Sequence, residues 1–234
     1  MKISIARIAL FSGMLILPGA AKERTFTSAD GKELTAEIVS ATEKDVTVKK
    51  SSDGKEYKLP LERLSKADQD FVAAWLEKAK INMRPEKDLE LEMEDGSKKT
   101  MKVPASEYLS WDGTLILYAG ETVHLEFAKD GDKWGDAEVV AEVKHPERTI
   151  TFSLTRTPQL TSLNRKTTMQ ETVAVDCGSR EVDSEDFARN NLIPTEKGKE
   201  ATDSWGGAVW CVRLTNIDVS TRPALEVYEE RLAK

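Results

Sequence analysis

Residues 59–72 read LPLERLSKADQDFV, and this stretch predicts the place where a strand gives way to a helix. Its leucines first alternate and then step by three residues, so the apolar period changes from that of a strand to that of a helix. Ser65 stands where the period changes, and its hydroxyl is expected to accept the backbone N–H of Asp68. The Asp68 carboxylate is expected to reach back to the N–H of Ser65. The stretch therefore predicts a helix that begins directly after Ser65.

Three alternating runs lie upstream of this helix, and Asp-Gly turn signals accompany them. The runs are ELTAEIV (33–39), DVTVKK (45–50) and KEYKLPL (55–61). The pair Asp53-Gly54 between the last two runs is a strong hairpin signal. Three or four short strands are too few to form a sandwich. They can close into a small barrel, with an amphipathic helix from Lys66 to about Lys80 packed on it.

Many positions between residues 24 and 72 match, in order, the pattern of one domain family. The matching elements are Arg24-x-Phe26-Thr27, Gly31-Lys32, Ala36-x-x-Val39, Val46-x-Val48-x-Lys50, Asp53-Gly54-Lys55 and Leu59-Pro60-Leu61-x-x-Leu64-Ser65-x-x-Asp68-x-x-Phe71-Val72. On these residues the region resembles the Sla homology domain of type one, known from a fungal endocytic adaptor and from exported bacterial proteins. The resemblance implies an SH3-like barrel and a peptide-binding ancestry, because the fungal domain recognises short Asn-Pro-Phe-x-Asp tails.

The first 21 residues, MKISIARIALFSGMLILPGAA, have the pattern of a signal peptide. Two basic residues precede an apolar run at 8–17, and small residues follow it. A membrane anchor is the alternative, but the run is too short to span a bilayer about 30 Å thick. We therefore expect cleavage after Ala21 and export to the periplasm, the cell envelope or the medium, with no membrane-integral mature chain.

The charge balance bears on the class of partner. The full chain has 34 basic and 41 acidic residues, a net charge of −7, and removal of Lys2 and Arg7 leaves −9. A general nucleic-acid binder needs a basic surface for the phosphate backbone, so this balance argues against nucleic acid.

Residues 85–234 read as a second, larger β domain. Pro85 ends any continuation of the helix, and alternating runs separated by Gly and Pro turns then recur at the spacing of a β-sandwich. The Gly-containing stretch 196–207 is predicted to be a loop, and 222–234 a short helix. The sequence thus predicts a mainly β chain. Its three parts are a signal peptide (1–21), a small SH3-like barrel with a packed helix (22–84) and a β-sandwich with a short C-terminal helix (85–234).

The two cysteines, Cys177 and Cys211, both fall in strand-like runs of the second domain. Export to an oxidising compartment favours a disulfide between them, and two buried free thiols are the alternative. A catalytic cysteine is disfavoured because neither has a histidine nearby in the sequence.

No pattern predicts a metal site, a cofactor or a catalytic group. His124 and His145 lack a neighbouring ligand set. Residues 130–136 imitate the start of a calcium loop, but Trp134 takes a ligand position and Ala141 stands where a bidentate Glu belongs, so a hairpin turn is the better interpretation. We therefore expect a non-enzymatic protein. An enzyme stays open only because scattered carboxylates could converge in the fold.

A basic cluster around the Asp53-Gly54 hairpin is the first candidate site. Its members are Lys49, Lys50, Lys55, Lys58 and Arg63. In an acidic protein, such a patch on a barrel with an exposed edge would suit an acidic peptide or protein partner. The alternative is an ordinary solvated hairpin whose charges protect an edge strand from aggregation.

Tryptophans in turn-like contexts are the second candidate site. Trp75 and Trp210 are expected in the cores, which leaves Trp111, Trp134 and Trp205. Flat aromatic faces on loops could stack on sugar rings, so a carbohydrate-binding or cell-wall-associated protein is the alternative function. These residues could equally anchor their loops onto the sandwich.

Overall fold

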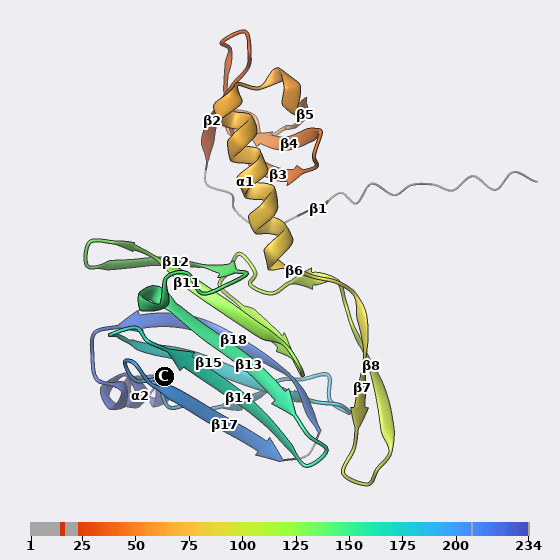
Figure 1. The fold of residues 1–234 in the computed structure, drawn as a ribbon, viewed down its shortest axis with the longest axis vertical. Coiled ribbons are helices and arrows are strands. Elements are labelled where there is room, and N and C mark those ends of the chain that lie inside the picture. Colours follow the sequence, from red (N-terminus) through yellow and green to blue (C-terminus); the bar gives the residue numbers. More distant parts are fainter. Residues whose placement is uncertain (1–14, 17–22, 207, 234) are drawn as a thin grey trace, which may run out of the picture. The chain divides into compact units, whose positions relative to one another are not determined.

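The computed structural model of the chain describes residues 15–16, 23–206 and 208–233, and it divides into two compact units (Figure 1). The first unit ends at Ala79 and the second runs from Lys80 to Lys234. The predicted signal peptide lies outside the described residues, apart from Leu15–Ile16, which form a short strand.

The first unit is one antiparallel sheet with a helix. Its elements are β1 (Leu15–Ile16), β2 (Arg24–Thr27), β3 (Glu33–Ala41), β4 (Asp45–Lys50), β5 (Glu56–Pro60), the 3-10 turn η1 (Leu61–Arg63) and α1 (Lys66–Asn82). The strand order is β1-β3-β4-β5, and β2 also pairs with β3. The core forms where the buried faces of β3 and β4 meet α1, and its buried members are Phe26, Ala36, Ile38, Ala41, Val46, Val48, Leu64, Val72 and Leu76.

The sheet of the first unit is open, so the prediction of a closed barrel is wrong, although the strands and the packed helix are confirmed. In the described residues, β2 and β5 share no ladder. One isolated bridge, Ser28 with Leu64, brings the end of β2 to the segment after η1. The physical reason is local. Pro60 lacks an N–H, and η1 turns the chain away before β5 can extend toward β2.

The start of α1 confirms the predicted N-cap but not the predicted return bond. The backbone N–H of Asp68 donates to Ser65 Oγ at 3.2 Å. The N–H of Ser65 instead donates to the Thr27 carbonyl at 2.7 Å. The Asp68 carboxylate reaches across to β2, where it accepts the Thr27 N–H at 2.8 Å and the Arg24 guanidinium at 2.9 and 3.1 Å. The cap therefore also joins the helix to the sheet.

The last turn of α1 belongs to the second unit, so the division falls a few residues before the predicted boundary at 84/85. The Asn82 side chain donates to the Leu109 carbonyl at 2.8 Å and accepts the Leu109 N–H at 2.9 Å. Directly after it, β6 (Met83–Arg84) pairs with β9 (Ser106–Glu107). These bonds all lie within the second unit.

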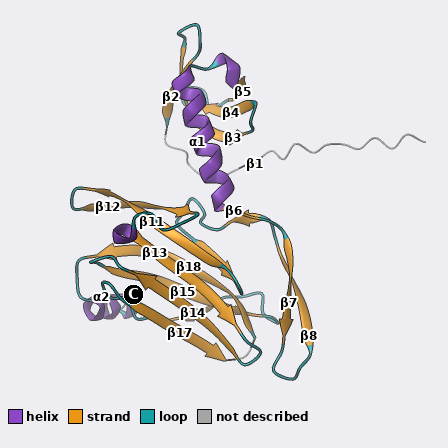
Figure 2. Cartoon of the chain, viewed as in Figure 1, coloured by secondary structure: helices purple, strands orange, loops and turns teal. Residues whose placement is uncertain are grey.

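The second unit is the predicted β-sandwich (Figure 2). One sheet has the order β10-β18-β15-β16 and the other β12-β11-β13-β14-β17. The remaining elements with their bounds are β7 (Lys87–Glu92), β8 (Lys98–Val103), β10 (Leu115–Tyr118), β11 (Thr122–Asp130), β12 (Lys133–Val140), η2 (Pro146–Arg148), β13 (Thr149–Arg156), β14 (Leu160–Thr167), β15 (Thr172–Glu181), β16 (Ala188–Asn190), β17 (Glu200–Gly206), β18 (Val209–Ser220) and α2 (Ala224–Leu232).

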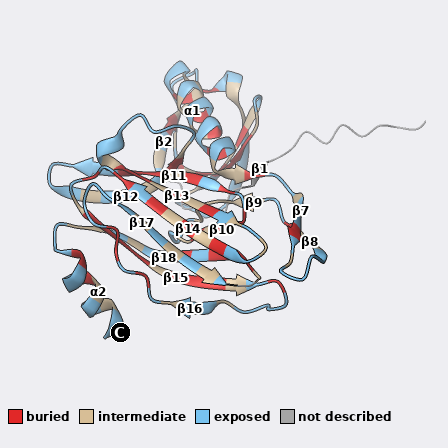
Figure 3. Cartoon of the chain, turned by 60° about the horizontal axis from the view of Figure 1, so that its bottom comes forward, coloured by how far each residue is buried: buried red, intermediate tan, exposed pale blue. Residues whose placement is uncertain are grey.

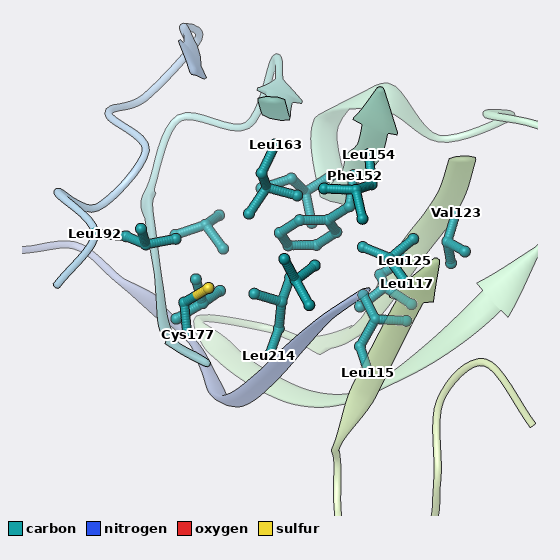
Figure 4. Packing of buried hydrophobic residues seen from close by; sticks show 14 of the residues in the cluster. Leu115, Leu117, Val123, Leu125, Phe152, Leu154, Leu163, Cys177, Leu192 and Leu214 are labelled. Carbon is teal, nitrogen blue, oxygen red and sulfur yellow. The ribbon is translucent and has the colours of Figure 1, made fainter. Parts of the chain in front are cut away.

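The main core lies between the two sheets, because alternate residues of each strand face inward (Figure 3). Leu115 and Leu117 from β10 and Leu214 from β18 meet Phe152 and Leu154 from β13 (Figure 4). A smaller apolar cluster covers the outer face of the four-stranded sheet. There, hairpin β7–β8 packs Leu91 and Val103 against Tyr118, Trp210 and Cys211.

The prediction of a loop over residues 196–207 is wrong in part, because residues 200–206 form the edge strand β17. Its side chains alternate between exposed and half-buried, and it pairs with β14 over its whole length. The half-buried positions are Ala201, Asp203 and Trp205. Because these inward positions hold a small, a charged and an aromatic residue, the alternation of burial does not appear as an alternation of hydrophobicity in the sequence. The predicted short C-terminal helix is confirmed as α2.

Candidate functional site

The hydrogen-bond phase of the β4–β5 hairpin is fixed by bonds at its two ends. The Lys50 N–H donates to the Lys55 carbonyl at 2.9 Å, and the Leu61 N–H donates to the Lys44 carbonyl at 2.9 Å. Both pairs belong to the same register. In an antiparallel pair, hydrogen-bonded and non-hydrogen-bonded residue pairs alternate along the strands. Every second residue of β5, counted from Lys55, therefore bonds to β4.

The residues between them turn their backbone groups to the outer edge of β5. Tyr57 and Leu59 bond to β4, so Glu56 and Lys58 direct N–H and C=O outward, and Pro60 directs only a C=O. β5 is the last strand in the order, so no strand among the described residues covers this edge. The sequence predicted an exposed edge on this domain, but not which residues direct their backbone groups outward. The available signal was Pro60, since a proline inside a sheet is confined to an edge or a bulge.

Two of the five predicted cations have acidic neighbours. Lys58 Nζ lies 3.2 Å from the Asp45 carboxylate. Lys49 stands in register with Glu37 on one side and Glu56 on the other, so opposite charges alternate across three strands. These acidic neighbours offset part of the positive charge that the sequence predicted at the hairpin.

The other three cations, Lys50, Lys55 and Arg63, have no carboxylate partner among the described residues. Lys50 and Lys55 meet at the turn end of the hairpin. Arg63 lies at the opposite end, in η1, where its carbonyl accepts the Ala29 N–H at 2.8 Å. These three cations therefore lie at the two ends of β5, with Lys50 at the end of the neighbouring strand β4, and they do not form one compact patch.

The two faces beside this edge differ in character. On one face lie Tyr57, which is 38% exposed, and the half-buried Leu59. The Tyr57 hydroxyl donates to Asp53 at 3.1 Å, and this hydrogen bond raises the pKa of Tyr57. On the other face lie Glu56 and Lys58. A segment added to the edge would thus meet an aromatic and aliphatic face on one side and a charged face on the other.

The three candidate tryptophans do not form one platform. Trp134 and Trp205 lie in β12 and β17, the two edge strands of the five-stranded sheet, so their predicted loop positions are wrong. The ammonium group of Lys129 covers the Trp134 ring at 4.3 Å, and Trp205 Nε1 donates to Asn190 at 2.8 Å. Both rings pack against the main core, as the anchoring alternative expected.

Trp111 lies in a turn, as predicted, and is 71% exposed. The turn is held by Asp112, whose carboxylate accepts the Ser110 hydroxyl at 2.8 Å and the Thr114 N–H at 3.0 Å. These hydrogen bonds lower the pKa of Asp112. Trp111 therefore presents a single aromatic face on an ordered turn.

The predicted disulfide is wrong, because both cysteines are free and face opposite sides of the same sheet. Cys177 pairs in register with Leu214 and points into the main core (Figure 4). Cys211 packs with Trp210 under hairpin β7–β8. Burial raises the pKa of each thiol to about 12. Nucleophilic thiolate chemistry is therefore suppressed at both positions.

We expect the native protein to resist thiol reagents. Because both sulfurs are buried and protonated, Ellman's reagent should titrate Cys177 and Cys211 only after denaturation, and dithiothreitol should leave the melting temperature unchanged. Absence of free thiols in the denatured, unreduced protein would show that the cysteines are bonded after all.

The remaining sequence candidates have structural partners. His124 Nδ1 lies 2.8 Å from Thr151 Oγ1. Asp130, at the end of β11, pairs with Lys133, at the start of β12, so the predicted hairpin turn is confirmed. The described residues contain no group of three His, Cys, Asp or Glu side chains placed to hold a metal ion. Among them there is also no helix with the length and hydropathy needed to cross a membrane.

Comparisons with known proteins identify no family for this chain. No protein-family model matches the chain, and neither the curated proteins nor the solved structures include a match. The resemblance to the Sla homology domain of type one therefore stays a prediction.

Proposed function

We propose that this protein is an exported, non-enzymatic binding protein that recognises an extended acidic segment of a protein partner. The segment would add as a strand to the outer edge of β5. The observation that carries the proposal is the outward-facing backbone of Glu56 and Lys58, flanked by the cations Lys55 and Arg63 that have no carboxylate partner among the described residues.

In strand addition, the backbone and the side chains of the added segment have different roles. Main-chain hydrogen bonds to an exposed edge supply affinity, and alternate side chains of the added strand supply specificity. A strand on β5 would place one set of side chains near Tyr57 and Leu59 and the other near Lys58. The complementary ligand therefore presents apolar residues to Tyr57 and Leu59, and it carries acidic residues toward Lys55 and Arg63 at the two ends of β5. The resemblance to a peptide-recognising domain family supports the same class of ligand.

The test uses residues 22–234 and a synthetic peptide of alternating Glu and Val, with a Lys-Val peptide as the charge control. We expect saturable, salt-sensitive binding of the acidic peptide alone. Lys58→Pro removes an outward N–H without removing a bond to β4, so it should abolish binding with little change in melting temperature.

Lys58→Ala is the matched control, because it removes the charge and keeps the N–H. We expect it to weaken binding only a few-fold. A folded Lys58→Pro protein that binds the peptide as the unaltered protein does would refute strand addition, and the basic hairpin would then be solvated surface. The carbohydrate alternative rests on the exposed face of Trp111 alone.

A further inference from the structure

A stack of alternating aromatic and guanidinium groups covers the outer face of the four-stranded sheet. Its first rings, Tyr118 and Trp210, lie with their centroids 5.1 Å apart. The Arg180 guanidinium lies 4.8 Å from the Trp210 ring and 5.0 Å from the Phe187 ring. Arg213, which is exposed, ends the stack 4.6 Å from Phe187. The stack therefore runs from a buried tryptophan to a solvent-exposed arginine.

The strand register explains how distant residues enter this stack. Cys211 lies opposite Arg180, while Val209 lies opposite Glu181, so Trp210 is an extra residue in β18. Such a bulge re-aims side chains. Trp210 and Cys211 both pack in the outer cluster, on the side of the sheet away from the main core.

The Phe187 ring lies between the two arginines, and it can pack there because Gly178 has no side chain. Arg213 lies opposite Gly178 in the register. A Cβ at Gly178 would meet the Cβ of Phe187 at 3.0 Å and ring atoms at 3.5 and 3.6 Å. The ring thus lies over the glycine and carries guanidinium groups beside it, so it offers no free face on which a sugar could stack.

Five of the nine arginines in the described part of this unit are bound to a carboxylate. Arg156, Arg180, Arg189 and Arg213 are not, and two of these four, Arg180 and Arg213, belong to the stack. The paired arginines are Arg84, Arg148, Arg165, Arg222 and Arg231. Arg180 and Arg213 have no such partner among the described residues, and nearby Asp183 is bound by Lys99 at 2.6 Å. Arg180 Nε and Trp210 Nε1 are buried donors without a hydrogen-bond acceptor. The stack holds an excess of donors.

We propose that Arg180, Phe187 and Arg213 form a second anion site, which receives a carboxylate group of an acidic protein segment. A guanidinium stacked on a ring keeps its in-plane N–H groups free, and these match a carboxylate in a bidentate arrangement. Charge complementarity selects an anion, and the covered ring disfavours an acidic sugar. The site lies in the second unit and does not depend on the β5 edge.

The test uses residues 22–234 carrying Lys58→Pro, so that binding along β5 does not contribute, and a tetraglutamate peptide as the probe. We expect saturable binding that Arg213→Gln weakens at least about tenfold, since a charge-assisted hydrogen bond is lost. Arg222→Gln is the matched control, because Arg222 is an arginine bound to Glu230. It should bind like its parent.

Gly178→Ala gives a second variant, in which the arginines stay and Phe187 is displaced. It should also weaken tetraglutamate binding, and thermal melting would verify that each variant is folded. Equal binding by Arg213→Gln and Arg222→Gln, or no saturable binding by the parent, would overturn the proposal. Stronger binding of oligogalacturonate than of tetraglutamate would overturn the choice of a protein carboxylate.

Discussion

Replacing Asp68 by alanine should destabilise the first unit by about 3 kcal/mol, because one carboxylate holds four contacts there. Asp68 is 3% exposed and accepts hydrogen bonds from Arg24, Thr27 and Ser65. Its loss leaves the Thr27 N–H and the guanidinium without an acceptor. The estimate is at the low end for a broken buried pair because the Arg24 side chain is 37% exposed.

Hydrogen exchange of the first unit's amides would measure this change without interference from the sandwich. Asp70→Ala is the matched control in the same helix. Asp70 pairs with Lys66 at 2.7 Å, but both side chains are exposed, so its loss should cost less than about 0.5 kcal/mol. Equal effects of the two substitutions would contradict the structural role given to Asp68.

The same carboxylate gives the first unit a pH dependence. Burial opposes ionisation of Asp68, but the bonds from Thr27, Ser65 and Arg24 outweigh it, so its pKa lies below the ordinary value of 3.8. A pKa that is lower in the folded state stabilises the fold above the unfolded value. This contribution is lost as the pH falls from 3.8 through the folded value. Asp68→Asn should lack this component of the acid transition.

Replacing Asp203 by alanine should destabilise the sandwich by about 3 kcal/mol, because it leaves the buried guanidinium of Arg165 without a counter-charge. Arg165 is 1% exposed and donates to Asp203 at 2.5 Å and to the Ile193 carbonyl at 2.9 Å. Without Asp203, the guanidinium keeps its desolvation cost and loses its counter-charge.

Arg165→Met separates this charge effect from packing, because it removes the charge and retains much of the volume. We expect it to cost less than Asp203→Ala, because the Asp203 side chain is 24% exposed and water can replace the guanidinium. Arg165→Met with Asp203→Ala should be far more stable than Asp203→Ala alone. Chemical unfolding of the three proteins would measure these differences. A double variant no more stable than Asp203→Ala would show that the charge is not the cause.

The sequence predicted the features of the fold that local periodicity determines. Alternating runs indicated the sandwich, and the change of period at Ser65 located the helix start. The disulfide failed because the register of β15 and β18, which no local pattern reveals, places Cys177 and Cys211 on opposite faces. The closed barrel failed because Pro60 and η1 end the last strand early.

In the candidate site, too, the sequence predicted which residues are present but not which residues strand pairing brings next to them. Composition identified the cations of the hairpin, but Asp45 comes from the start of β4, and Glu37 and Glu56 flank Lys49 only once the strands are paired. The stack of Arg180, Phe187 and Arg213 depends on strand pairing and on Gly178, so the sequence alone gave no signal for it.

The most direct measurement is the exchange rate of individual β5 amides in residues 22–234, with and without the Glu-Val peptide. In the free protein, the amides of Tyr57 and Leu59 should be protected, and those of Glu56 and Lys58 should exchange rapidly. Saturation with the peptide should protect Lys58, since its N–H then bonds to the added strand. If Lys58 exchanges as rapidly in the complex as in the free protein, the peptide does not bind along β5 and the proposed function is wrong.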